Sequence, residues 1–401
     1  MHAGDNENDV ASLAVLRVVA GLALVVLAIF LSFGLKPFDG YLGTSTHFAY
    51  RGLEWVKPLP PLGLRFVALV LGLSAGAMVI GWRTRITTKV AAVTTAYLFF
   101  LDCAYYESTA YLGVLLLAIL AFAPSGRLLL VRFQVACVYV FSGISKWNAD
   151  WLSGRTLRTM APSHPVDPSV MAIGGMLFDI AIVPLLLVRR TRAIAFVALA
   201  LFHVHNALVL ELGAVPWLML AASTVFLSPS WPRRLAPSLF RHCPAREVTR
   251  GGWRLPVALA WISVQLVVPL RRHVVQGDPY FTESGFHFTW ALRSRQKSSV
   301  AELVAVDRKT GARERLPIAR DIPAPQAARV AGDPYAIWQS AQRLAMNRDV
   351  EVHADAWVAL NGASSVRLVD PNVDLTKVRY PLVGSPCWVR SSSRYPLPPC
   401  R

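Results

Sequence analysis

Long runs of apolar residues, separated by short polar loops, fill the first two thirds of the chain. A run of about 20 apolar residues is long enough to cross a bilayer as a helix. The pattern therefore predicts a mostly α-helical bundle of about eight or nine transmembrane helices within residues 1–270. The predicted spans are residues 12–34, 62–82, a third ending near 101, 111–123, a fifth within 133–151, a sixth ending at 188, a seventh ending at 210, 215–227 and 255–270.

The pattern changes after residue 270. Residues 300–307 alternate between polar and apolar positions as a strand does, and a hairpin with its turn at Asn361-Gly362 is predicted from residues 350–369. Asp333 and Pro334 predict the start of a helix that runs to residue 348. Residues 271–401 are therefore expected to form a small, β-rich α+β domain. Their apolar pattern is too sparse for a free domain, so we expect it to pack on the outer mouth of the bundle.

Composition and charge agree with a membrane protein. Hydrophobic residues make up 54% of the 401 residues and charged residues only 16%, against about a quarter charged in soluble proteins. The net charge of +17 lies largely in arginines of the short loops, which orient membrane proteins. The lipid bilayer is the expected partner, and no nucleic acid is needed to explain the charge.

The positions of the arginines predict the orientation. The clusters after the second, fourth, sixth and eighth spans fall on one face of the membrane, and the positive-inside rule makes that face cytoplasmic. The chain is thus expected to be a multi-pass cell-membrane protein with a cytoplasmic N-terminus and residues 271–401 outside. The acidic first residues and the length of the first apolar run argue against a cleaved signal peptide, so the first span would serve as the insertion signal.

The five cysteines do not suggest a metal site. Cys103, Cys137 and Cys243 lie in or near spans and lack metal-ligand spacing, so no metal is predicted. Cys387 and Cys400 are close enough in sequence to form a disulfide outside the cell, although two free thiols are equally compatible with the sequence.

Lys146 is the polar residue that draws most attention. The residues before it, from Phe133 onward, are largely apolar, aromatic or small on all sides of a helix. An amine held in such surroundings loses hydration, which favours its neutral form and makes it a base. Alternatively, Lys146 snorkels, with its ammonium among the lipid headgroups.

Other polar residues in the spans are candidates for a site or for helix packing. Asp179 lies in the middle of the sixth span, where an acid is either paired or functional. His203 and Asn206 are three residues apart and share a helix face, so they could bind one small polar ligand or could hydrogen-bond to another helix. The start of the fourth span carries residues that could simply cap that helix, namely Ser108, Thr109 and Tyr111.

Several of these segments resemble the vitamin K-dependent gamma-glutamyl carboxylase family, with its HTTM-type membrane domain. The resemblance covers nearly the whole chain, in the same order, and suggests a short homologue of bacterial type. It is carried by residues 132–134, Gly143, Lys146, Asn148-Ala149-Asp150-Trp151, Phe202-His203, Asn206, residues 47–58, Phe286-His287-Phe288-Thr289-Trp290, residues 353–358 and residues 370–374.

The resemblance implies a chemistry. In that family the lysine at the position of Lys146 is the base that deprotonates vitamin K hydroquinone; reaction with O2 then creates a stronger base, which removes a proton from a peptide glutamate, and CO2 adds to form gamma-carboxyglutamate. The implied partner is a glutamate-containing secreted peptide or protein. By the same resemblance His203, Asn206, Ser108, Thr109 and Tyr111 would line the quinol site, and Asp150, Trp151 and Asp179 would serve the substrate or the structure.

One departure from the family leaves the activity open. Where the family has an Asn-His pair, this chain has Ser108 and Thr109, and a threonine hydroxyl is not a base near neutral pH. The leading hypothesis is a carboxylase-like lyase. Its alternatives are a different quinol-dependent membrane enzyme and a non-catalytic protein that binds quinones or lipids.

Overall fold

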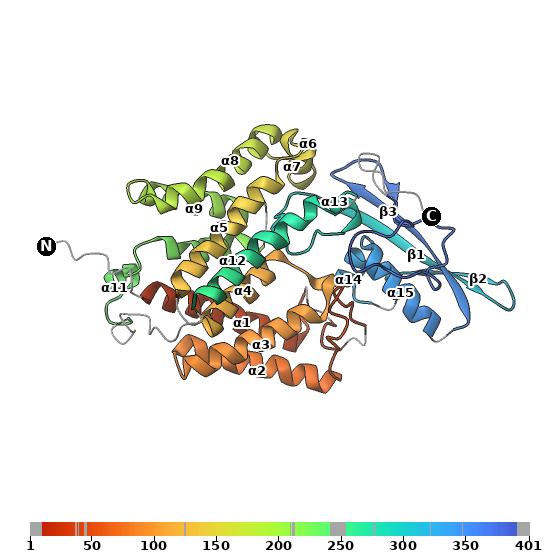
Figure 1. Cartoon of the computed structure of the whole chain (residues 1–401), viewed down its shortest axis with the longest axis horizontal. Coiled ribbons are helices and arrows are strands. Elements are labelled where there is room, and N and C mark those ends of the chain that lie inside the picture. The colour runs from red at the N-terminus through yellow and green to blue at the C-terminus, as the bar shows by residue number, and fades with distance from the viewer. Residues whose placement is uncertain are drawn as a thin grey trace.

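A computed structural model of the chain has a helical bundle and, at one end of it, a small sheet with its own helices (Figure 1). The sheet and its helices lie beside α6, α7 and α13. The structure describes residues 10–36, 38, 40–43, 46–123, 126–208, 210, 213–240, 254–275, 277–320, 322–346 and 348–390.

Each predicted span contains a helix. Among the described residues, five helical segments are long and apolar enough to cross a membrane: Ala11–Phe33, Pro61–Ile80, Arg127–Ser145, Pro168–Leu187 and Leu255–His273. By length and composition, the chain is therefore a multi-pass membrane protein. The other apolar helices are shorter, so the number of eight or nine crossings stays a prediction. The main bundle helices are α1 (Ala11–Phe33), α2 (Pro61–Ile80), α3 (Thr84–Leu101), α4 (Ser108–Phe122), α5 (Arg127–Ser145), α8 (Pro168–Leu187), α9 (Arg192–Leu208), α10 (Val215–Ser223) and α12 (Arg254–Leu270).

Short helices connect these elements. Local sequence explains two of the boundaries: α8 begins where Asp167 accepts hydrogen bonds from the main chain of Ser169 and Val170, and α2 ends at Gly81, whose φ of 82° suits glycine. The short elements are η1 (Cys103–Tyr105), α6 (Ala149–Leu152), α7 (Arg155–Met160), η2 (Thr224–Phe226), α11 (Trp231–Leu235), η3 (Arg271–His273) and α13 (Pro279–Thr282).

The fifth predicted span is shorter than its apolar run. Helix α5 ends at Ser145, and Lys146 is the residue that caps its C-terminus. The chain then turns and starts α6, where the Asn148 side chain accepts a hydrogen bond from Trp151 N. Hydropathy alone could not detect this break, because Asn148 acts as a helix cap through a local hydrogen bond.

The part of the chain after residue 270, named the outer domain for its predicted side of the membrane, has one antiparallel sheet among its described residues, in the order β2-β1-β3-β4. The hairpin turn is confirmed, since Asn361 and Gly362 both have the positive φ angles, 51° and 72°, that such turns require. The helix predicted after Asp333 is confirmed as well, with Asp333 Oδ1 accepting from Tyr335 N at 2.9 Å. The elements are β1 (Lys297–Asp307), β2 (Arg313–Pro317), α14 (Ala324–Val330), α15 (Pro334–Met346), β3 (Val350–Leu360) and β4 (Val366–Arg367).

The outer domain packs directly on the bundle, as expected, and one hydrophobic core includes residues of both parts. The Tyr111 ring of α4 lies 4.8 Å from the Phe288 ring and 4.9 Å from the Trp290 ring. The loop before α2 also joins the parts, because the main chain of Ala49 exchanges two hydrogen bonds with the Gln339 side chain of α15. The bundle end and the outer domain therefore form one packed unit.

Candidate functional site

Lys146 lies inside the protein at the end of α5, with 7% of its surface exposed. Its Nζ forms an ion pair with Asp179 Oδ2 of α8 and donates to Ser142 Oγ at 3.2 Å. Ser142 Oγ in turn donates to Asp179 Oδ2 at 2.8 Å. The three polar groups form a closed triangle, so the side chain does not extend into bulk solvent.

Gly143 and Trp151 define the surroundings of the amine. A Cβ built on Gly143 would lie 2.6 Å from Ile180 Cγ1 and 3.3 Å from Asp179 Cβ, so only glycine lets α5 approach α8 this closely. On the other side, Lys146 Nζ lies 5.2 Å from the centre of the Trp151 ring. The Trp151 indole is held by a 2.8 Å hydrogen bond to Ala172 O of α8. Trp151 therefore provides an aromatic wall beside the amine.

The ion pair changes the interpretation of the sequence. The apolar residues before Lys146 predict a lone amine, whereas the structure places a buried carboxylate beside it. Asp179 is only 4% exposed, and a buried charge without a partner costs several kcal/mol. The available sequence signal was that two rare ionisable groups occur within the spans. Their pairing across 33 residues was not predictable from spacing.

A second polar group lies deeper in the bundle. The Tyr139 hydroxyl contacts His203 Nε2 of α9 at 2.7 Å and Ser223 Oγ of α10 at 3.1 Å. Tyr139 and Lys146 are two turns apart on one face of α5, about 10 Å along the helix. His203 Nδ1 is buried and has no hydrogen-bond partner among the described residues. This histidine therefore makes the helix-to-helix contact foreseen for it, while its role in binding a ligand stays a prediction.

The other predicted site residues are not gathered around Lys146. Helix α4 starts without a side-chain cap, so the capping role considered for Ser108, Thr109 and Tyr111 is wrong. Tyr111 belongs to the aromatic contact with the outer domain, and Ser108 Oγ lies 3.5 Å from the Tyr106 hydroxyl. Thr109 is half-buried. Within the described part of the chain, no hydrogen bond joins these residues to Lys146.

Asp150 connects the amine's neighbourhood to the outer domain. Its carboxylate pairs with Arg155 at 3.1 Å and accepts a 3.2 Å hydrogen bond from Asn361 Nδ2 at the hairpin turn. The Tyr280 hydroxyl of α13 donates to Ser145 O at 2.9 Å.

Asn206 of α9 is half-buried. Its side chain makes no hydrogen bond with the described residues.

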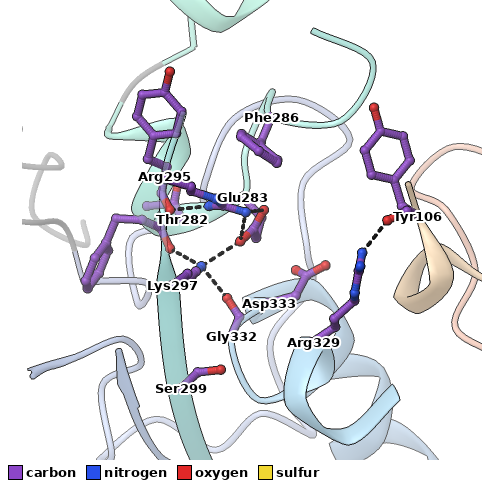
Figure 2. Close-up of polar contacts among 12 residues, drawn as sticks. Tyr106, Thr282, Glu283, Phe286, Arg295, Lys297, Ser299, Arg329, Gly332 and Asp333 are labelled. Atoms are coloured by element: carbon purple, nitrogen blue, oxygen red, sulfur yellow. Dashed lines mark hydrogen bonds and ion pairs between the residues drawn. The ribbon is translucent and has the colours of Figure 1, made fainter. Parts of the chain in front are cut away.

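The outer domain contains a buried charge cluster that no pattern in the sequence predicted. Figure 2 shows Arg295 and Lys297 reaching the carboxylate of Glu283, at 2.7 and 2.6 Å. Although burial alone would raise it, these two cations lower the pKa of Glu283 to about 2. Burial and the neighbouring Glu283 raise the pKa of Asp333 to about 6. A cavity of about 180 Å³ lies beside them, and Cys103 and His287 also line it.

Neither the metal nor the disulfide prediction is settled by the geometry. Within the described ranges no three His, Cys, Asp or Glu residues are grouped closely enough to hold a metal ion. Cys103 and Cys137 are free and buried. Cys387 takes part in a disulfide, whereas Cys243 and Cys400 lie outside the described residues, so the Cys387–Cys400 pair stays a prediction.

Comparison with protein families agrees with this architecture. The HTTM domain matches residues 6–129 and 123–231, which include α5, α8 and α9. The lumenal domain of vitamin K-dependent gamma-carboxylase matches residues 252–394, from α12 through the whole sheet. No solved structure matches significantly.

These regions define a membrane protein of the HTTM class that carries a carboxylase-type lumenal domain. The chain belongs to the vitamin K-dependent gamma-carboxylase family. It is thus a carboxylase-like multi-pass membrane protein, of a family that in general uses vitamin K, O2 and CO2.

Proposed function

We propose that this protein is a quinol-dependent gamma-carboxylase that converts peptide glutamate to gamma-carboxyglutamate, with Lys146 as the initiating base. The observation that carries the proposal is the position of the Lys146 amine, buried at the end of α5 between Asp179 and the Trp151 ring. A buried lysine with no mechanistic use would be expensive to keep in a membrane segment.

The residues present fit a reduced naphthoquinone. Such a ligand is apolar apart from two hydroxyl groups, so it needs an apolar wall and a few polar atoms. Trp151 provides the wall, Lys146 Nζ an acceptor when neutral, and His203 Nδ1 a buried nitrogen without a partner. Tyr139 fixes the His203 ring through Nε2. When bound with O2, the hydroquinone supplies the strong base that the side chains alone do not provide.

Asp179 is the carboxylate partner of the proposed base. In the proposed step, one proton moves from a quinol hydroxyl to the neutral Lys146 amine. The ammonium formed in this way is stabilised by the Asp179 carboxylate beside Nζ. Ser142 Oγ, hydrogen-bonded to both groups, keeps Nζ and Oδ2 aligned.

The peptide would approach from the outer domain. Tyr280 contacts the last residue of α5 and Asn361 contacts Asp150 of α6, so the outer domain lies on both sides of the turn that carries Lys146. Together with the arginine distribution, this supports residues 271–401 as the extracytoplasmic part and a secreted glutamate-containing polypeptide as the substrate. A lipid-soluble quinol would enter from the bilayer.

The test supplies purified protein in nanodiscs with reduced vitamin K, O2, a glutamyl peptide and labelled bicarbonate. We expect vitamin K epoxide and label fixed in the peptide, with both products lost, by at least a hundredfold, in Lys146→Met. Lys89→Met is the matched control, because Lys89 is an exposed lysine near the start of α3. Full activity of Lys146→Met would exclude the proposed base.

Thr109 supports a second candidate, a protein that binds quinone without carboxylating. A histidine is expected here from the family, and a threonine hydroxyl cannot replace it as a base. Epoxide without fixed label would indicate a different quinol-dependent enzyme, and neither product would indicate the binding protein. Carboxylation gained in Thr109→His would identify the loss of that histidine as the cause.

A further inference from the structure

Strand β1 has an open edge over its first half. Strand β2 pairs with β1 only from Glu302 to Val306, and Pro317 is the last β2 residue in the ladder. Proline has no N–H to donate, which suits the end of a strand. Beyond it, Ile318 N donates to Ala301 O at 3.3 Å and the pairing stops. In contrast, β3 pairs with β1 along its whole length, from Lys297 to Asp307.

The hydrogen bonds that exist define which main-chain groups face this edge. Ala301 O accepts from Ile318 N, and Asp307 N donates to Ala312 O, so the odd-numbered residues of β1 point toward the β2 side. Main-chain groups alternate along a strand. The N–H and C=O of Ser299 therefore point toward the open edge, and no strand among the described residues pairs with them.

A groove of about 460 Å³ follows the same edge. One wall is lined by alanines, Ala327 and Ala328 of α14 and Ala331 just after it, and these small side chains leave room beside β1. The other wall carries Val300, which is 67% exposed, and Trp357 across from it on β3. The groove is thus apolar on both sides of the Ser299 main-chain groups, which no described strand pairs.

The groove leads toward the membrane part. Ser299 and Ala328 line both the groove and the 180 Å³ cavity beside Glu283. That cavity is also lined by Cys103 and Tyr106, which belong to the turn between α3 and α4. Figure 2 shows Ser299 below Lys297. Glu283 lies above Lys297, and Tyr106 lies to the right. A chain lying in the groove therefore continues an interface that joins the two parts.

We infer that the open edge of β1 binds an extended segment of a polypeptide as an added β-strand, with alternate apolar side chains against the alanine wall. Strand addition at an exposed edge gives affinity through main-chain hydrogen bonds and selectivity through alternate side chains. The open stretch from Lys297 to Ala301 is about 15 Å long, enough for four or five peptide residues. In the context of the proposed function, this segment would be the part of the substrate that flanks its glutamate.

A peptide probe tests the main-chain contacts. The probe is a fluorescein-labelled seven-residue peptide in which valine alternates with glutamate or lysine, and its binding to the full chain in nanodiscs is measured by anisotropy without quinol. Two further probes carry N-methyl groups, one on the valines and one on the other residues. Only one set of N–H groups can face β1, so we expect one methylated probe to bind at least tenfold more weakly than the other. Equal binding of both, or no binding of the parent peptide, would overturn the inference.

A pair of variants tests whether the peptide binds in the groove beside β1. Ala328→Arg fills the groove from an exposed position of α14, and Ala324→Arg puts the same charge on the same helix outside the groove. We expect Ala328→Arg to weaken the parent peptide at least tenfold and Ala324→Arg to leave it within twofold. Unchanged binding by a folded Ala328→Arg protein would contradict the site. The N-methyl comparison uses the unmodified chain, so it decides the matter even if that variant does not fold.

Failure of this inference is distinct from failure of the carboxylase proposal. Peptide binding is measured without quinol, and carboxylation is measured on a blocked single glutamate, which is too short to form a strand. Binding without carboxylation would reject only the proposed reaction. Carboxylation of the blocked glutamate without strand-dependent peptide binding would reject only the docking edge.

Discussion

Gly143 of α5 lies against Ile180 of α8, and a Cβ at Gly143 would come within 2.6 Å of Ile180 Cγ1. This contact brings the two helices together one turn before Lys146 and next to Asp179. The ion pair of the site therefore depends on a residue that makes no polar contact through a side chain.

Substitution of that glycine is expected to separate the pair. In Gly143→Ala the new methyl group must displace Ile180 or shift α8, which moves Asp179 away from Lys146. We expect a loss of about 1 to 3 kcal/mol in stability from overpacking and at least a tenfold loss of quinol oxidation. Gly174→Ala is the control, because a Cβ there meets nothing within 4 Å. Similar effects of both substitutions would refute the role of the close approach.

Removal of one member of the ion pair should cost more than removal of both. Asp179→Leu leaves the Lys146 amine buried without a carboxylate, which is expected to destabilise the protein by about 3 to 5 kcal/mol. The double variant Lys146→Met, Asp179→Leu should recover most of that loss. The free energies of unfolding of the original protein, the two single variants and the double variant are measured with increasing fractions of sodium dodecyl sulfate in a mild detergent. Additive losses would mean that the two groups do not interact.

The outer domain should show a pH-dependent stability that depends on Asp333. Its pKa is raised to about 6 in the folded protein from 3.8, so the folded state binds the proton more tightly. The stabilisation from this group is fully present below about pH 4 and is lost as the pH rises through about 6. The substitution Asp333→Asn keeps the helix cap, because the amide oxygen can accept the same hydrogen bond, but the new side chain does not titrate.

Asp333→Asn should therefore gain stability relative to the original protein between pH 4 and pH 7, by about 1 to 3 kcal/mol. The quantity to measure is the difference in stability between the two proteins at each pH. His287 adds the same pH dependence, of opposite sign, to both proteins. Burial lowers the pKa of His287 to about 4, so this group destabilises the fold as the pH falls. Thermal unfolding followed by tryptophan fluorescence gives both curves. A constant difference across this range would contradict the assignment.

The contacts of the outer domain with the end of α5 are also open to test. Tyr280→Phe removes the hydrogen bond to Ser145 O. Asn361→Ala removes the hydrogen bond to Asp150 and the one accepted from Gln296 N, at a position with a positive φ angle. We expect Tyr280→Phe to cost about 1 kcal/mol and Asn361→Ala about 2 to 3 kcal/mol, and both to increase amide hydrogen exchange in the turn around Lys146. Asn372→Ala, at an exposed position elsewhere in the domain, is the control. Unchanged exchange in both interface variants would indicate that the turn is rigid by itself.

Local patterns in the sequence were sufficient for most of the fold. The apolar runs predicted the helices, and the Asn361-Gly362 turn and the Asp333 cap were predicted from local chemistry that acts within a few residues. Contacts across the fold were not predictable in this way. The pairing of Lys146 with Asp179, and of Glu283 with Arg295 and Lys297, arises only when separate segments pack together. Lys146 could be selected as unusual, but not its partner.

The hydrogen bonds from Tyr280 and Asn361 lie on either side of the turn that carries Lys146, at Ser145 and at Asp150. We therefore expect a displacement of the sheet domain to move this turn. A polypeptide bound to the sheet domain would then alter the alignment of the Lys146 amine without contacting it.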